Sequence, residues 1–128
     1  MKNIIIILIV LLTISCSLDR TNPLDPLISG EGYPEEVPNI DVDTIDNHTI
    51  IYWSEMQNVD GYYIYRSQSY YGLFKLIKDV EDEGATSFED LEAIVTNNDD
   101  EYWYKMSAYI IINGENLEGY RSDPNIWN

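Results

Sequence analysis

The sequence predicts an all-β protein in which a sandwich of seven strands follows a signal peptide and a flexible linker. From Val37 onward, short runs rich in β-branched and aromatic residues alternate apolar with polar positions, which is typical of strands with one buried face. Turn-forming residues separate these runs at intervals of about 8–12 residues, the spacing of two-sheet sandwiches. No segment sustains the 3.6-residue periodicity of an amphipathic helix.

The first five expected strands are defined by this alternation and by the turn residues between them. In the second strand, Ile51 and Trp53 face one side, whereas Ile50 and Tyr52 face the other. The third strand begins at Gly61 and is rich in tyrosine, a residue that favours strands. We expect these five strands at Asn39–Thr44, His48–Ser54, Gly61–Ser67, Leu73–Lys78 and Thr86–Asp90.

The last two strands are expected to form a hairpin. Glu101–Ile112 is the longest run, and its alternate residues are apolar or aromatic. Asn113 and Gly114 follow it, and an Asn-Gly pair suits a tight turn in which both central residues have positive φ. We therefore expect Leu117–Asp123 to return beside the long strand.

Aromatic and glycine-containing motifs occur along these strands in a fixed order. Residues 61–67 read Gly-Tyr-Tyr-Ile-Tyr-Arg-Ser, and residues 102–109 read Tyr-Trp-Tyr-Lys-Met-Ser-Ala-Tyr. The accompanying motifs are Trp53, Gly72-Leu73-Phe74 and Thr86-Ser87-Phe88-Glu89-Asp90. In this order and spacing they resemble a bacterial fibronectin type III domain, over about residues 37–126. The resemblance implies an immunoglobulin-like sandwich, which we expect to occupy residues 37–128.

The resemblance also implies structural roles for particular residues. Trp53 would be the central aromatic side chain of the core, and Ile64, Met106 and Ala108 would line the inner faces of the two sheets. Tyr102 would be the tyrosine at the corner before the sixth strand, whose hydroxyl bonds to backbone upstream. Aromatic burial of this kind gives a domain of about 90 residues a sufficient core without disulfides.

The N-terminus has the features of an export signal. Lys2 precedes an apolar run over residues 4–12, which is too short to span a bilayer. Residues 12–16, Leu-Thr-Ile-Ser-Cys, resemble a bacterial lipobox. The resemblance implies that residues 1–15 are removed and that Cys16 carries acyl chains such as palmitate, which anchor the protein to a membrane. An ordinary signal peptide with a chance cysteine, or a free thiol, is the alternative interpretation.

Residues 16–36 are expected to be the lipidated cysteine and an extended linker. They include Pro23, Pro26 and Pro34 and show no sustained periodicity, so we expect a semi-rigid tether. Residues 22–26, Asn-Pro-Leu-Asp-Pro, look like a short motif that follows the lipidated cysteine in exported bacterial lipoproteins. The expected location is therefore the bacterial cell envelope, on the periplasmic or cell-surface side.

The charge of the chain excludes several classes of partner. The 128 residues contain 23 Asp and Glu against 7 Lys and Arg, for a net charge of −16. Removal of residues 1–15, in which Lys2 is the one charged side chain, makes it −17. Nucleic-acid binding requires clustered cations, and anionic lipid surfaces attract basic segments, so neither is an expected partner. We expect membrane attachment through the lipid alone.

Catalytic and metal-binding signatures are not found in the sequence. His48 is the one histidine and Cys16 the one cysteine, so no zinc-ligand set exists. We therefore expect neither an enzyme nor a cofactor. Two acidic groups, at residues 41–46 and 97–101, carry oxygen ligands that suit Ca²⁺, but they lack the EF-hand pattern, and we expect solvated charge.

A tyrosine pair forms the candidate binding site. Tyr70 and Tyr71 lie in the expected loop between the third and fourth strands, where they can stack on sugars or anchor a protein, and Tyr120 and Trp127 are expected to add to this surface. The alternative is that Tyr70 and Tyr71 cover the edge of the core. The expected function is a lipid-anchored, non-catalytic binding or spacer module for a protein or polysaccharide. A structural subunit of an envelope assembly is the alternative, and a small enzyme is the third hypothesis.

Overall fold

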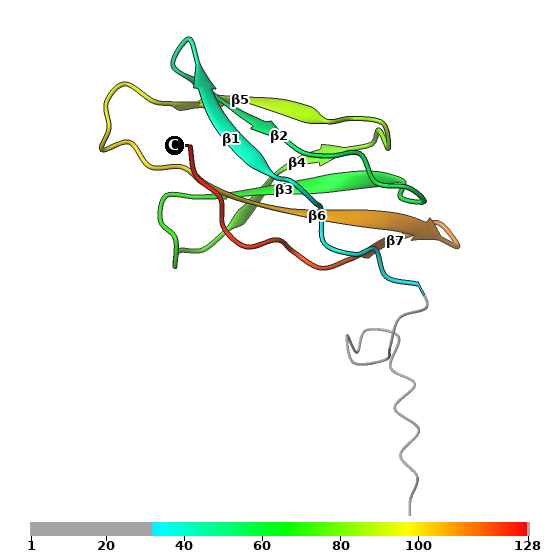
Figure 1. Ribbon diagram of the computed structural model, residues 1–128. Coiled ribbons are helices and arrows are strands. Elements are labelled where there is room, and N and C mark those ends of the chain that lie inside the picture. The colour runs from blue at the N-terminus through cyan, green and yellow to red at the C-terminus, as the bar shows by residue number, and fades with distance from the viewer. Residues whose placement is uncertain (1–31, 128) are drawn as a thin grey trace, which may run out of the picture. The chain divides into compact units, whose positions relative to one another are not determined.

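The computed structural model describes residues 32–127, which form two packed antiparallel sheets (Figure 1). The predicted all-β, seven-stranded sandwich is confirmed. The predicted signal peptide, Cys16 and residues 17–31 of the predicted linker lie outside the described residues. The strands are β1 (Asp41–Ile45), β2 (His48–Tyr52), β3 (Gly61–Ser67), β4 (Lys75–Val80), β5 (Ser87–Ile94), β6 (Trp103–Ile112) and β7 (Glu115–Glu118).

The strand order places three strands in one sheet and four in the other. The three-stranded sheet has the order β1-β2-β5, and the four-stranded sheet has the order β4-β3-β6-β7.

The third strand has the predicted bounds, but β5 continues to Ile94, four residues beyond the predicted end. It does so because Ala93 is buried in the core and Ile94 pairs with His48 after a register shift in β2. A bulge of this kind keeps both strands in one ladder.

The β6–β7 hairpin closes at the predicted Asn-Gly turn. Asn113 and Gly114 have φ values of 53° and 81°, and Ile112 pairs with Glu115 across the turn. The predicted hairpin is therefore confirmed. β7 is shorter than predicted, but residues 119–125, here called the C-terminal segment, still bond to β6 at intervals. The backbone NH of Gly119 donates to the carbonyl of Ala108 at 2.8 Å, for example.

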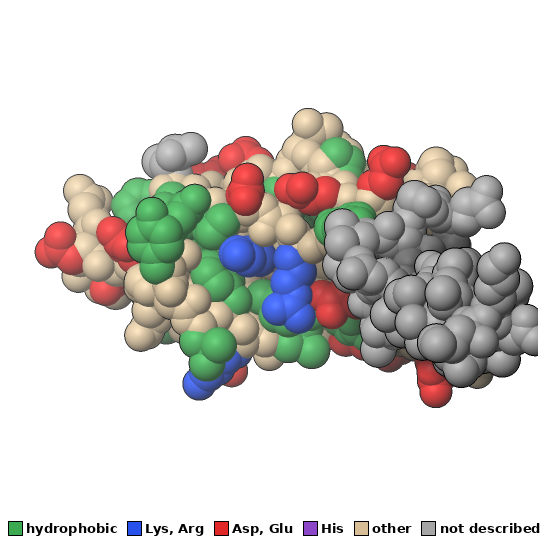
Figure 2. All heavy atoms as spheres, turned by 90° about the horizontal axis from the view of Figure 1, so that it is seen from below, with side chains coloured by type: hydrophobic (Ala, Val, Ile, Leu, Met, Phe, Trp, Pro, Cys, Tyr) green, Lys and Arg blue, Asp and Glu red, His purple; other side chains and the backbone are tan. Residues whose placement is uncertain are grey.

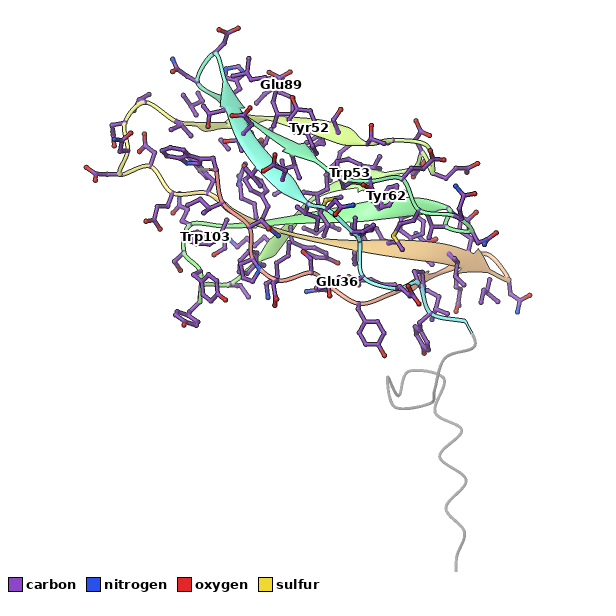
Figure 3. All side chains as sticks on the ribbon, viewed as in Figure 1. Glu36, Tyr52, Trp53, Tyr62, Glu89 and Trp103 are labelled. Carbon is purple, nitrogen blue, oxygen red and sulfur yellow. The ribbon has the colours of Figure 1, made fainter. Side chains whose placement is uncertain are left out.

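The core lies between the two sheets around Trp53. Its side chain is 4% exposed, and its ring lies 5.4 Å from the ring of Tyr62. Ile64, Met106 and Ala108, which the family resemblance placed on the inner faces of the sheets, are fully buried. Figure 3 shows Trp53 and Tyr62 side by side between the sheets.

The tyrosine hydroxyl that bonds to backbone is that of Tyr62, and not that of Tyr102 as the family resemblance implied. Tyr102 is half-buried and packs against the core, but within residues 32–127 its hydroxyl makes no hydrogen bond, so the expected bond to upstream backbone is not found. Tyr102 precedes the first paired residue of β6, and its ring contacts the guanidinium of Arg66, 5.8 Å from the ring centroid. Instead, the Tyr62 hydroxyl links two loops: it accepts from the Met56 NH at 3.0 Å and donates to the Glu83 carbonyl at 3.1 Å.

A buried ion pair joins the two sheets. Arg66 of β3 donates to both carboxylate oxygens of Asp90 on β5, at 2.9 and 2.7 Å. The hydroxyl of Tyr104 on β6 donates to the same carboxylate at 3.0 Å. Burial and the negative charge of Asp90 both raise the pKa of Tyr104. Arg66 also reaches the exposed carboxylate of Glu92 at 3.3 Å.

The chain joins the domain beside the C-terminal segment. Pro34 and Val37 are buried, and the carbonyl of Pro34 accepts a hydrogen bond of 3.4 Å from the Tyr120 NH. Tyr33 lines a pocket together with Glu55 and neighbouring residues of the β2–β3 loop. The described chain therefore begins at the end of the sandwich that carries the β2–β3 and β6–β7 turns (Figure 1).

Candidate binding surface

The candidate site is built on the outer face of the four-stranded sheet. Successive side chains of a strand point to opposite faces, so the residues that alternate with the buried Tyr104 and Met106 of β6 point outward. These outward residues are Trp103 and Lys105. Trp103 pairs with Ser67, the last residue of β3, at the end from which the β3–β4 loop projects (Figure 3).

Three aromatic side chains form one group at this end, here called the aromatic patch: the exposed Tyr70 and Tyr71 and the half-buried Trp103. The rings of Tyr70 and Tyr71 meet edge to face at 4.6 Å, and Tyr70 meets Trp103 in the same way at 5.1 Å. Tyr71 is 94% exposed, so it does not cover the edge of the core. The Trp103 indole NH donates to Glu101 at 3.0 Å, which holds the indole in one orientation.

The loop that carries the tyrosines is shaped by small polar residues. The Ser67 hydroxyl accepts a bond of 3.3 Å from the Ser69 NH, and the Ser69 carbonyl accepts a bond of 3.1 Å from the Gly72 NH. A Cβ at Gly72 would collide with the hydroxyls of both serines. A side chain at this position would therefore displace the serine hydroxyls that shape the turn from which Tyr70 and Tyr71 emerge.

Lys105 and a fourth aromatic ring, Phe74, extend the patch along the sheet. The Lys105 ammonium lies 4.9 Å from the centroid of the Phe74 ring, within cation–π range. Beneath the loop, a pocket of about 590 Å³ is lined by Ser67, Gln68 and Lys75 among others. The outer face thus offers aromatic rings and a cation close together, with a pocket beside the loop.

The other two residues predicted for this surface lie elsewhere. Trp127 packs against the core, and its indole NH donates to the Asp100 carbonyl at 3.3 Å. Tyr120 is exposed on the C-terminal segment, next to Pro34, near the middle of β6. Neither joins the aromatic patch, because the C-terminal segment runs along β6 and then turns inward at Trp127.

Trp103, Phe74 and Lys105 are functional candidates that the sequence analysis did not assign to the site. For Trp103 and Lys105, the alternation of buried and exposed positions along the strand could have indicated the binding surface. Trp103 and Lys105 occupy the phase of β6 opposite to its buried residues, and a tryptophan in the solvent-facing phase is a marker of a contact surface. The position of Phe74 depends on the β3–β4 register, including a bulge between Ile64 and Tyr65, which the sequence does not display.

An ordered polar network supports the same face farther along the sheet. One carboxylate oxygen of Glu118 accepts hydrogen bonds from Tyr65 and Ser107, both at 2.7 Å, and from Arg121 at 3.0 Å. Burial opposes ionisation of Glu118, but the bonds from Arg121, Tyr65 and Ser107 outweigh it and lower its pKa. Burial, followed by the bond to Glu118, raises the pKa of Tyr65 to about 12. The network fixes the C-terminal segment to β3 and β6.

The described residues give no sign of a metal site or a membrane span. In residues 32–127, no three His, Cys, Asp or Glu side chains are grouped to hold an ion. The carboxylate of Asp100 accepts bonds from Thr96 and Asn97 instead, which lowers its pKa. His48 pairs with Glu89 at 3.2 Å. That part of the chain also has no helix of the length and hydrophobicity needed to cross a bilayer.

Comparison with known proteins supports the fold. No protein-family model and no curated protein matches the sequence. The structure is similar to the crystal structure of an Fn3-like protein from Clostridium thermocellum, with a TM-score of 0.59 and 21% sequence identity. The match covers 74% of this chain and 92% of that one. The predicted fibronectin type III-like fold is confirmed, and such a fold is compatible with a non-catalytic binding or spacer module.

Proposed function

We propose that this protein is a lipid-anchored module of the bacterial cell envelope that binds a protein or polysaccharide through its aromatic patch, without catalysing a reaction. The observation that carries the proposal is the position of the patch. The described chain begins at one end of the sandwich, and Tyr70, Tyr71 and Trp103 lie at the other.

The length of β6 gives the separation of the two ends. β6 has ten residues and runs from Trp103 at the patch to Ile112 beside the opposite end. At 3.2–3.4 Å per residue it spans about 30 Å. The aromatic patch is therefore remote from the point where the chain enters the domain, so the entering chain leaves it accessible to a partner. Binding residues are commonly carried on loops at the end of a rigid scaffold in this way.

The chemistry of the patch favours binding over a packing role. Tyr and Trp side chains at a protein surface provide a large contact area with little conformational entropy to lose, and they are enriched at contact surfaces. Their neighbours Ser67, Ser69 and Gln68 add hydroxyl and amide groups that can bond to sugar hydroxyls or to peptide groups.

The test compares three forms of the full-length lipidated protein. Wild-type protein, the Tyr70→Ala/Tyr71→Ala variant and a Tyr52→Ala control are applied to glycan arrays and to isolated envelope fractions. Tyr52 is also exposed but lies on the other sheet. We expect the Tyr70/Tyr71 variant to lose a bound component that the control retains. Equal binding by all three forms would contradict the proposed site.

The anchor is tested separately. A Cys16→Ala variant is expected to lose labelling by radioactive palmitate and to be released from membranes in washes without detergent. A variant that remains bound to membranes after such washes would show that another part of the chain provides the attachment.

A further inference from the structure

The positive side chains of the domain are confined to one sheet. Two of the seven Lys and Arg residues and three of the 23 Asp and Glu residues precede residue 32, which leaves five cations and 20 acids. β1, β2 and β5 contain no Lys or Arg. The five cations are Arg66, Lys75, Lys78, Lys105 and Arg121, on β3, β4, β6 and the C-terminal segment. Figure 2 shows positive side chains together in the middle of this side, next to hydrophobic ones.

Ion pairs neutralise only the two arginines. Arg66 pairs with Asp90 and Glu92, and Arg121 pairs with Glu118. Across residues 32–127, none of the three lysines forms an ion pair. This is unexpected where acids outnumber cations four to one, since surface lysines readily find carboxylates in such a chain. The three lysines of this sheet therefore keep their charges free of direct carboxylate contacts within the described residues.

Of the three lysines, Lys105 lies beside the aromatic patch. It is half-buried, its ammonium lies over Phe74, and it shares the outer face of β6 with Trp103, two residues earlier. Two residues along a strand correspond to about 7 Å. A phenylalanine ring attracts the ammonium but does not neutralise it. Lys105 is therefore a fixed, uncompensated positive charge beside the aromatic patch.

We infer that Lys105 and the aromatic patch form a site for an acidic polysaccharide, in which sugar rings stack on Trp103 and Tyr70 and a uronate carboxylate binds the Lys105 ammonium. The inference rests on the proposed function and specifies its ligand. The apolar faces of sugar rings pack against aromatic rings, and a carboxylate accepts a charge-assisted hydrogen bond from an ammonium group. Glu101 is the acid that the contacts place at the site itself, and its carboxylate accepts the bond from the Trp103 indole NH. Acids farther than about 8 Å from the site oppose binding little, because such charges are screened at physiological ionic strength.

The experiment measures binding of the full-length protein in detergent to three uronate polymers: polygalacturonate, alginate and hyaluronate. Each polymer is compared with its carboxyl-reduced form, which keeps the backbone and removes the charge. We expect at least one uronate polymer to bind about tenfold more tightly than its reduced form, which is the effect of one charge-assisted hydrogen bond.

Two lysine variants separate a site from overall charge. Lys105→Gln is expected to abolish the preference for the uronate polymer. Lys78→Gln removes the same charge from β4 of the same sheet, away from the patch, and is expected to keep the preference. Equal losses in both variants would overturn the inference, because the effect would then come from net charge.

The remaining outcomes distinguish the inference from the proposed function. Equal binding of uronate and reduced polymers, or no binding of the three uronates, would overturn the inference. If Tyr70 and Tyr71 still governed capture of an envelope component, the proposed function would stand without it. If no ligand or envelope component bound in a way that depends on Tyr70 and Tyr71, both the inference and the proposed function would be overturned.

Discussion

The ion pair between Arg66 and Asp90 gives the sharpest prediction about stability. The pair joins β3 to β5, and therefore one sheet to the other, and the Asp90 side chain is 5% exposed against 21% for Arg66. We consider the single variants Asp90→Leu and Arg66→Met and the double variant that combines them. The double variant replaces both charges by apolar groups of similar volume, so it leaves no unpaired charge behind.

The magnitudes follow from burial and from the partners that remain. Removal of one member of a buried pair costs about 3–5 kcal/mol, because the other charge is left without compensation. Arg66 keeps some contact with water and with Glu92, so we expect Asp90→Leu to cost about 3 kcal/mol. For a domain of 60–100 residues this lowers Tm by about 12–24 °C. The double variant should cost clearly less than the sum of the single variants, since it leaves no unpaired charge and its remaining cost comes from the buried Tyr104 hydroxyl, which loses its bond to Asp90.

The assay is urea unfolding of all four forms, followed by tryptophan fluorescence. Glu92→Ala is the control: this partner of Arg66 is 82% exposed, and its loss should cost less than about 1 kcal/mol. The reasoning is refuted if Asp90→Leu costs less than about 1 kcal/mol. It is equally refuted if the costs of the single variants simply add in the double variant, since the two side chains would then act independently.

Three further predictions concern the core, a turn and the response to acid. Trp53→Ala should cost about 3–5 kcal/mol in urea unfolding, because it empties the centre of the core; a small shift would deny Trp53 that role. Gly114→Ala should cost about 1 kcal/mol of unfolding free energy, because φ is positive at this residue. Gly84→Ala is the control and should not destabilise, because its φ is ordinary and only an Asp side chain lies nearby. Similar urea midpoints for the two variants would contradict this. The lowered pKa of Glu118 stabilises the fold above its unfolded-state pKa of about 4.3, and this contribution disappears as the pH falls through the folded-state pKa. Midpoints of wild type and Glu118→Gln should therefore converge below that pH, and a gap that persists unchanged to pH 3 would rule the reasoning out.

Strand positions could be predicted from the sequence where one face is buried. The alternation around Ile51 and Met106 placed two strands, β2 and β6, within two residues of their observed bounds, because a half-buried strand repeats every second residue. The end of β5 could not be predicted in this way. Leu91 is exposed and Ala93 is small, so the strand beyond Asp90 lacks a strong apolar rhythm, and its pairing depends on a register shift in β2.

The binding surface could be predicted in part. Tyr70 and Tyr71 were identified because a tyrosine pair in a loop has no place in the core pattern. Trp103 was assigned to a family motif rather than to a surface, and its contact with Tyr70 is a tertiary one. Trp127 was predicted to lie on the binding surface, but it packs against the core. The sequence does not show whether a tryptophan near the end of the chain is exposed or buried, because this depends on the path of the last residues.

The attachment of Pro34 to the C-terminal segment determines how the domain responds to mechanical load. Tension on the chain that precedes residue 32 reaches the domain first through one hydrogen bond, from Tyr120 to Pro34, and the packing of Pro34 and Val37. The five-residue ladder of β1 with β2 bears the load only afterwards. The weaker contacts yield first, and each freed residue lengthens the chain by about 3.3–3.6 Å. The sandwich can thus absorb a small pull as slack while the opposite end keeps its shape.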